Sequence, residues 1–403
     1  MYIAILGRQP ALGVAELECL YGAAAVRWFG GQAATITSDI FDFERLGGSQ
    51  KAGRVVLELR GTWLAVSRQI VRHYSAQWQG APHKITLGIS AYGFSTTARE
   101  VQKTGLILKA KLRASGTSLR LIPNAAPALN TATSHHNKLG RSPHHIELLV
   151  VRAQDGRVIV AESVGAQNIS ALAARDQARP RTDAFVGMLP PKLARMMINM
   201  AGLLVQPSPT TEHSVPRPLL LDPFCGTGTV LQEALLLGYD VCGSDLNPKM
   251  VSYTSENLTW LQRRSAAATP GTVHGVTQAD ATTHQWPLAQ QLSAVVCETY
   301  LGQPFSAPPA PAKLSAVRTT CNHIISHFLT NLRPQLRPGT PLVIAVPAWR
   351  SSDGQFTYLP LITQLEQLGY QRRLLQHVRP ADLCYYRENQ VVARELLVME
   401  VMK

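Results

Sequence analysis

The sequence predicts an α/β protein in which a Rossmann-like C-terminal domain follows smaller α+β modules. The chain has 403 residues, more than one hydrophobic core usually organises. Its first 165 residues combine short apolar strands with amphipathic helices, whereas strands and helices alternate regularly from Leu219 onward. Regular alternation of this kind indicates a parallel sheet covered by helices on both faces.

The N-terminal region contains two predicted modules. Residues 1–80 read as a ferredoxin-like α+β module with strands at 2–6 and 55–59, and in its helix LAVSRQIVRHY we expect Leu64, Ile70 and Val71 to face inward. Residues 81–165 contain the basic amphipathic helix AREVQKTGLILKAKLRAS and the strand segments ITLGISAYG, SLRLI, IELLVVRA and RVIVAESV.

Positive charge is concentrated in the second module. Lys and Arg outnumber Asp and Glu by 39 to 26, which gives a net charge of +13. An excess of this kind suggests a polyanionic partner, because cations that neutralise phosphates release counterions. A solvated helix face is the alternative, but clustering in one small module favours a nucleic-acid surface. The predicted RNA-binding residues are Arg99, Lys103, Lys109, Lys111, Arg113, Lys138 and Arg141.

A linker at 166–188 leads to the Rossmann-fold domain at 189–403. Pro191 suits the first turn of the helix PKLARMMINMAG, and LLVQPSPTTEHSVPRP predicts a loop. The predicted strands are LLLD, YDVCGSD, HGVTQAD, LSAVVCE and PLVIAVPA, and the predicted helices between them are TVLQEALLLG and PKMVSYTSENLTWLQRR. YQRRLLQHV and QVVARELLVMEV should form an antiparallel pair.

Several classes of protein are disfavoured. The six cysteines form no CxxC pair, so we expect no metal site and no disulfide framework. The first residues lack the basic lead and long apolar stretch of a signal peptide. No apolar run approaches the roughly 18 residues that span a bilayer. We therefore expect a cytoplasmic protein without a membrane partner.

The segment with the strongest chemical signal is DPFCGTGT, between a predicted strand and a helix. Glycines at Gly226 and Gly228 allow a tight turn and close approach of the backbone to a ligand. The amides that open the next helix favour a carboxylate, and Asp222 can accept a hydrogen bond from a ligand ammonium. The full segment is not the GxGxxG of dinucleotide oxidoreductases. The predicted cofactor-binding residues here are Asp222, Pro223, Phe224, Cys225, Gly226 and Gly228.

Two further strands end in carboxylates. Asp245 closes the second strand and is followed by Leu246, so its carboxylate can take both hydroxyls of a ribose. The alternative is a helix N-cap, because Pro248 follows. The third strand ends in Asp280 and Ala281, where the Asp280 side chain can accept an adenine amine. The adenosine of a cofactor would therefore lie along these strand ends.

The fourth strand ends in Glu298-Thr299-Tyr300-Leu301. A carboxylate that accepts amine protons and a ring that stacks on a base would orient an exocyclic amine toward an electrophilic methyl group. Positioning of this kind can lower a barrier by ~7–11 kcal/mol. We expect Glu298 and Tyr300 to be catalytic. A structural carboxylate at a strand end is the alternative for Glu298.

Together these segments resemble a known family. DPFCGTGT resembles motif I of the amino-methyltransferases, and Glu298 and Tyr300 stand where those enzymes carry a [DNS]PPY motif, from which this sequence departs. With GSDLNPKM, YYRENQVVAREL and the connector RDQARPRTDAFVGMLPPKLARMMINMAG, the chain resembles the THUMP-domain tRNA guanosine N2-methyltransferases of the guanosine-10 type. LGISAYG, SLRLIPN and HNKLG resemble the THUMP module.

The resemblance implies a class I methyltransferase domain that uses S-adenosyl-L-methionine and a THUMP-like module that grips tRNA. It implies that the connector brings Leu189 and Pro190 near the cofactor. It further implies that the enzyme reaches its base by flipping it. Some relatives need a small activating protein partner, and the sequence sets neither that need nor the oligomeric state.

Two other functions stay open. A DNA amino-methyltransferase acting on adenine or cytosine shares the catalytic arrangement, although an intact [DNS]PPY motif and a target-recognition insertion are absent from the sequence. A catalytically degenerate RNA-binding protein would explain the altered fourth motif, whereas the intact Asp222, Gly226, Gly228 and Asp245 argue against it. An NAD oxidoreductase is a more distant alternative.

Overall fold

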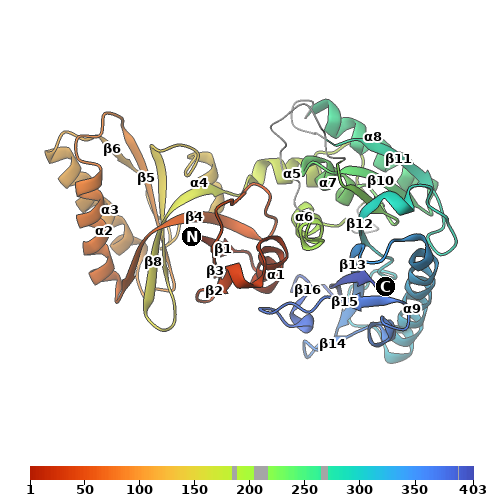
Figure 1. The fold of residues 1–403 in the computed structure, drawn as a ribbon. Coiled ribbons are helices and arrows are strands. Elements are labelled where there is room, and N and C mark those ends of the chain that lie inside the picture. Colours follow the sequence, from red (N-terminus) through yellow and green to blue (C-terminus); the bar gives the residue numbers. More distant parts are fainter. Residues whose placement is uncertain (184–187, 204–216, 265–270, 389) are drawn as a thin grey trace. The chain divides into compact units, whose positions relative to one another are not determined.

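The computed structural model describes residues 1–183, 188–203, 217–264, 271–388 and 390–403. The chain divides into two compact units, Met1–Ala171 and Leu172–Lys403, each with its own sheet (Figure 1). The predicted loop LLVQPSPTTEHSVPRP lies almost entirely at 204–216, outside the described residues. No helix in the described ranges is both long enough and apolar enough to cross a membrane.

The first unit alternates strands with helices. Its elements are β1 (Tyr2–Leu6), α1 (Pro10–Tyr21), η1 (Ala23–Ala25), β2 (Val26–Trp28), β3 (Ala33–Ile36), β4 (Ser49–Arg60), α2 (Trp63–Gln77), β5 (Ile85–Tyr92), α3 (Ala98–Ala114), β6 (Leu119–Leu121), α4 (Thr131–His136), β7 (His145–Arg152) and β8 (Arg157–Ala166).

One eight-stranded sheet runs through both predicted N-terminal modules. Its order is β2-β3-β1-β4-β8-β7-β5-β6. β4 pairs antiparallel with β1 on one side and with β8 on the other, so the sheet continues across residue 80. β5 pairs parallel with both β6 and β7. The division into two modules at that residue stays a prediction.

Helices α2 and α3 pack together against this sheet (Figure 1). The buried stripe of α2 consists of Trp63, Val66, Ile70, Val71 and Tyr74. The expectation that Leu64 faces inward is wrong, because its side chain is 62% exposed. The buried stripe begins at the first residue of the helix, Trp63, and recurs every three or four residues. Leu64 follows Trp63 by one position, so its side chain is rotated by about 100° away from that stripe and faces solvent.

A buried ion pair ties the middle of this sheet together. The ammonium of Lys51 on β4 contacts the carboxylate of Glu147 on β7, and both side chains are almost fully buried. Lys51 Nζ also donates to the Leu129 carbonyl at 2.7 Å, and Ser90 on β5 donates to Glu147. Burial lowers the pKa of Lys51, and the charge of Glu147 opposes that shift. Residues on both sides of residue 80 therefore share one buried polar network.

The elements of the second unit include the strands and helices predicted for a Rossmann-like domain and others that the sequence did not predict. They are α5 (Ile169–Gln177), which begins at the boundary, then α6 (Pro191–Met200), β9 (Leu219–Asp222), α7 (Thr229–Leu236), β10 (Asp240–Asp245), α8 (Pro248–Arg264), β11 (Val273–Gln278), η2 (Ala289–Gln291), β12 (Leu292–Glu298), α9 (Pro311–Leu332), η3 (Arg333–Gln335), β13 (Pro341–Arg350), β14 (Phe356–Thr357), η4 (Pro360–Gln364), β15 (Tyr370–Arg372), η5 (Pro380–Asp382), β16 (Cys384–Tyr385) and β17 (Val392–Val401).

The second sheet has the order β11-β10-β9-β12-β13-β17-β15. The first five strands are parallel, and β17 inserts antiparallel between β13 and β15. The predicted antiparallel pair near the end of the sequence is thus confirmed as β15 with β17. The order turns back at β9, whose neighbours are β10 and β12, and a reversal of this kind opens a crevice at the carboxyl ends of the strands.

Helix α9 covers one face of this sheet. Its buried residues Cys321, Ile325, Phe328, Leu329 and Leu332 join a core that includes inward residues of β9, β12, β13 and β17. α6 and α7 pack on each other, and they contact β13 and β9 respectively. Sequence patterning did not single out α9, because its Thr, Ser, Asn and His residues have weak helix propensity.

Loss of the buried ion pair should destabilise the first unit. Glu147→Ala leaves the Lys51 ammonium buried without its counter-charge, and we expect a loss of about 3–5 kcal/mol in the free energy of unfolding. Denaturant unfolding measures the loss, and hydrogen exchange of β5 and β7 peptides assigns it to this unit. As a control, Asp155→Ala removes the exposed partner of Arg157, 2.7 Å away, and should leave unfolding nearly unchanged. Equal losses in the two variants would contradict the role of the pair.

Candidate active site

The turn after β9 has the tight geometry that its glycines predict. Gly226 and Gly228 adopt positive φ values of 52° and 82°. The Gly228 N–H donates to the Cys225 carbonyl at 2.7 Å, and the Cys225 N–H donates to the Ser244 carbonyl on β10 at 2.9 Å. A Cβ atom at Gly228 would lie 2.9 Å from Thr254 Cγ2, so a side chain there would push α8 away.

Asp245 holds this turn in place. One oxygen of its carboxylate accepts the Gly226 N–H at 2.9 Å, and the other accepts the Asn247 N–H at 2.9 Å. Asn247 Oδ1, rather than the Asp245 carboxylate, accepts the Lys249 N–H in the first turn of α8. The capping function at the start of α8 therefore belongs to Asn247. Asp245 joins two strand ends at the carboxyl edge.

Asp222 is the most deeply buried carboxylate of the turn. It is 1% exposed at the end of β9, and its Oδ1 accepts the Phe224 N–H at 3.1 Å. Burial raises its pKa well above the ordinary value for aspartate, and the negative charges of Asp245 and Glu298 raise it further. A cationic group bound here would offset both the burial of the Asp222 carboxylate and its repulsion by Asp245 and Glu298.

The other residues of the turn pack against both neighbours. The Phe224 ring meets Phe328 of α9 edge to face, with centroids 4.9 Å apart. The Pro223 carbonyl accepts a hydrogen bond from Ser244 Oγ at 3.4 Å. Burial raises the pKa of Cys225 well above its ordinary value, so this thiol stays neutral and packs as a small apolar group.

The edge beyond β10 and β11 is more open. The Leu246 side chain is 66% exposed. Asp280 is also exposed, and its Oδ1 accepts the backbone N–H and the hydroxyl of Thr282 at 2.9 Å and 2.7 Å. These hydrogen bonds lower the pKa of Asp280, so its carboxylate is ionised. Ala281 beside it is buried.

The fourth motif contains a contact that the sequence did not predict. The guanidinium of Arg394 on β17 donates through Nε to Glu298 Oε1. Thr299 is anchored as well, because its N–H and its hydroxyl both bond the Ala345 carbonyl of β13 at 3.0 Å. The Tyr300 side chain is 44% exposed. The segment is therefore fixed by hydrogen bonds where the resembled motif carries prolines.

The connector before α6 is bound to the same turn. Asn257 of α8 is fully buried, and its Nδ2 donates to the Arg181 and Thr227 carbonyls, both at 2.9 Å. Asn257 Oδ1 accepts the Arg181 N–H at 3.0 Å, and Arg179 donates to Thr229 Oγ1 at 2.7 Å. Sequence reasoning missed these contacts, although the polar Asn257 on the apolar side of α8 was a signal that could have found them.

Charge also anchors the connector and α6. Arg175 of α5 and Arg195 of α6 both contact the buried carboxylate of Glu233 on α7. Pro190 is the N-cap of α6, and Leu189 just before it is 6% exposed. Pro191 begins the helix as predicted. Part of the resembled connector, 184–187, lies outside the described residues.

The predicted RNA-binding residues of the first unit are all exposed. Five of them lie on α3, whose single acidic residue, Glu100, is held in a capping box with Thr97. Lys138 and Arg141 follow α4, and Arg120 of β6 bonds Asn137 at 3.4 Å, which places β6 beside the end of α4. Arg141 pairs with Glu44 at 3.5 Å. The charged residues exposed on α3 are thus basic except for Glu100, and Leu106 and Ile107 are exposed on the same helix.

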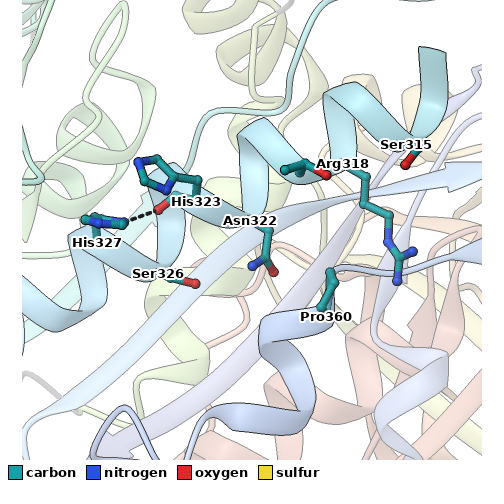
Figure 2. Close-up of a pocket in the computed structure, with 8 residues that line it drawn as sticks. Ser315, Arg318, Asn322, His323, Ser326, His327 and Pro360 are labelled. Atoms are coloured by element: carbon teal, nitrogen blue, oxygen red, sulfur yellow. Dashed lines mark hydrogen bonds between the residues drawn. The ribbon is translucent and has the colours of Figure 1, made fainter. Parts of the chain in front are cut away.

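A separate groove of about 390 Å³ lies between α9 and η4 (Figure 2). The rings of His323 and His327 contact each other with centroids 3.9 Å apart and planes tilted by 43°, and His327 Nδ1 donates to the His323 carbonyl at 2.8 Å. Arg318 donates to the Tyr358 carbonyl at 2.8 Å. The groove shares no lining residue with the glycine turn.

The sheet order, the turn after β9 and the carboxylates around it define a Rossmann-like domain with a candidate ligand site at its carboxyl edge. Two solved structures show the fold over the whole chain. TrmN from Thermus thermophilus has a TM-score of 0.50 and 17% identity, and the alignment covers 100% of this chain and 99% of that one. A possible methylase from Clostridium difficile 630 has a TM-score of 0.51 and 11% identity, with 100% and 97% covered.

Sequence comparisons match parts of this chain to methyltransferases. Residues 179–298 match the family described as the RMKL-like methyltransferase domain, UPF0020. A tRNA (guanine(10)-N2)-dimethyltransferase of Methanothermobacter thermautotrophicus is 42% identical over 85 residues, which cover 21% of this chain and 22% of that protein. The protein of the same name from Methanocaldococcus jannaschii is 42% identical over 72 residues, or 18% and 17%. The matched segments span about a fifth of each relative.

Removal of the Asn257 side chain should release the connector. Asn257→Ala deletes three buried hydrogen bonds to Arg181 and Thr227, so we expect faster trypsin cleavage after Arg181 and a lower free energy of unfolding, by about 1–3 kcal/mol. Asn331→Ala is the matched control, because Asn331 bonds the Ala281 and His284 carbonyls elsewhere in this unit. Cleavage after Arg181 that is equally fast in both variants would argue against a local anchor.

Proposed function

We propose that this chain is an S-adenosylmethionine-dependent methyltransferase that methylates the exocyclic N2 amine of a guanosine in tRNA. The observation that carries the proposal is the placement of Asp222, Asp245 and Glu298 around one glycine turn at the carboxyl edge of a parallel sheet. The names of the two curated relatives supply the base and the atom. A tRNA substrate would place this activity in the cytoplasm.

The turn fits a cofactor that carries both an amino-acid group and an adenosine. Asp222 would bind its ammonium, because burial among carboxylates favours a cation at this position. The first amides of α7 would face its carboxylate. The remaining proposed contacts are Asp245 for the ribose, Leu246, Asp280 and Ala281 along the adenine, and Pro223, Phe224, Cys225, Gly226, Gly228, Leu189 and Pro190 around them. The bound cofactor supplies a methyl group on an electrophilic sulfonium.

Glu298 and Tyr300 would orient the amine. Glu298 is ion-paired through Oε1, and its side chain keeps 17% of its area exposed at the edge of the sheet. It can accept an amine proton and so hold the nitrogen in line for transfer. The exposed ring of Tyr300 can stack on the base. Methyl transfer to this amine needs a correctly oriented nitrogen rather than a strong general base.

The first unit would hold the RNA. Its basic residues Arg99, Lys103, Lys109, Lys111, Arg113, Lys138 and Arg141 can pair with phosphates without reading sequence. Contacts of this type offset the few kcal/mol that flipping a base costs.

Cofactor affinity should fall as the pH falls. Because the pKa of free Asp222 is raised, part of the protein carries a proton there above the ordinary titration range of aspartate, and a ligand ammonium must displace it. Calorimetry with S-adenosylmethionine in two buffers of different ionisation enthalpy should show proton release that disappears at high pH. Asp222→Asn should remove the proton release, whereas Asp280→Asn should keep it. Binding without proton release at any pH would contradict this role.

Tritiated S-adenosylmethionine should label unmodified tRNA and leave duplex DNA unlabelled. Nucleoside mass spectrometry should find N2-methylguanosine or its dimethyl form. Glu298→Gln should lose most of the turnover while cofactor affinity is kept, because a neutral amide oxygen accepts an amine proton more weakly than a carboxylate does. Labelled adenine or cytosine in DNA would favour the DNA enzyme. Tight tRNA binding without any methyl transfer would favour a binding protein.

A further inference from the structure

We propose that Arg394 is a positioning residue that fixes the orientation of Glu298 toward the target amine. This inference rests on the proposed function. Arg394 is 6% exposed, and its Nε donates to Glu298 Oε1. Among the described residues, Glu298 Oε2 accepts no hydrogen bond from the protein, so one oxygen is held and the other is left for a ligand.

Strand register explains how the two residues meet. Glu298 of β12 lies opposite Ala345 of β13, and Ala345 lies opposite Leu396 of β17. Arg394 faces Pro347, two residues nearer the carboxyl edge, and shares its face of the sheet with Leu396. Its side chain therefore crosses β13 from beyond the end of β12. The small side chain of Ala345 lets it pass.

The charges near Glu298 explain why a cation is needed there. Asp222 on β9 and Asp245 on β10 are also acidic, and the charges of Asp245 and Glu298 act on Asp222. The facing residues of β13, Ala345 and Pro347, are neutral. Like charges repel one another, and the ion pair with Arg394 offsets that repulsion at Glu298.

Arg394 also compensates for the altered motif. Glutamate has one more rotatable bond than the aspartate of a [DNS]PPY motif, and Thr299 and Tyr300 lack the rigidity of two prolines. The guanidinium restrains the longer side chain, while the two bonds from Thr299 to the Ala345 carbonyl restrain the backbone. The site thus obtains by hydrogen bonding the fixed geometry that proline would impose.

Three variants of the full chain test the proposal. Arg394→Met should lower kcat for methylation of tRNA at least ~10-fold with little change in the KM for S-adenosylmethionine, because orientation is lost and cofactor contacts are kept. Arg394→Lys keeps the charge but lacks the planar fork of donors, so it should restore only part of kcat.

Arg372→Met is the matched control. Arg372 pairs with Glu395, the next residue of β17, at 3.1 Å, and that pair lies on the opposite face of the same strand. Its loss should lower the free energy of unfolding to a similar degree and leave kcat unchanged. Thermal unfolding followed by circular dichroism verifies that each variant is folded. If Arg394→Met does not fold, Arg394→Lys still tests the proposal.

Each outcome decides one point. A wild-type kcat in Arg394→Met, or the same loss of kcat in Arg372→Met, would overturn the positioning role while the proposed function stands. A wild-type protein that methylates no tRNA would overturn the proposed function and this inference with it. A selective loss of kcat in the Arg394 variants, with the KM for S-adenosylmethionine kept, supports both.

Discussion

The hydrogen bond from the Gly226 amide to Asp245 is the interaction on which the site depends. It joins the turn after β9 to the end of β10, so two neighbouring strands present their carboxyl ends as one surface. Gly228 lets α8 approach this turn closely, and Thr254 of α8 bonds the Gly226 carbonyl at 2.7 Å. Asn257 of α8 then donates hydrogen bonds both to the turn, at the Thr227 carbonyl, and to the connector, at the Arg181 carbonyl. Strand, turn, helix and connector are thus fixed by one chain of short polar contacts.

Buried charge has a different task in each unit. Lys51 and Glu147 hold strands of the first sheet together, where only protein groups contact them. In the second unit Glu233 fastens two helices through Arg175 and Arg195, while Arg394 and Glu298 lie at an edge with partial exposure. Ion pairs cost desolvation energy wherever they are buried. The pair at the carboxyl edge can offset that cost with a function, because the second oxygen of Glu298 accepts no hydrogen bond from the described residues.

The sequence predicted the parts of the fold that depend on local patterns. Alternating strands and helices located the Rossmann-like domain, and the glycines located the turn, because positive φ has a strong sequence signature. Leu64 was placed wrongly because one helical residue shifts the buried stripe by 100°, and α9 was missed because polar residues hide its apolar stripe. Arg394 could not be placed next to Glu298, since the two are 96 residues apart and only the pairing of β13 with β17 brings them together.

The insertion of β17 between β13 and β15 has a consequence for biosynthesis. A ribosome makes this strand after every other strand of its sheet, yet its place is in the interior of the order rather than at the rim. A nascent chain that has not yet released residues 392–401 therefore exposes two unpaired edges and lacks the cation beside Glu298. The protein would complete its sheet and the carboxyl edge around Glu298 in the same late event, so a stalled or shortened translation product should be prone to aggregation and should lack the Arg394–Glu298 pair.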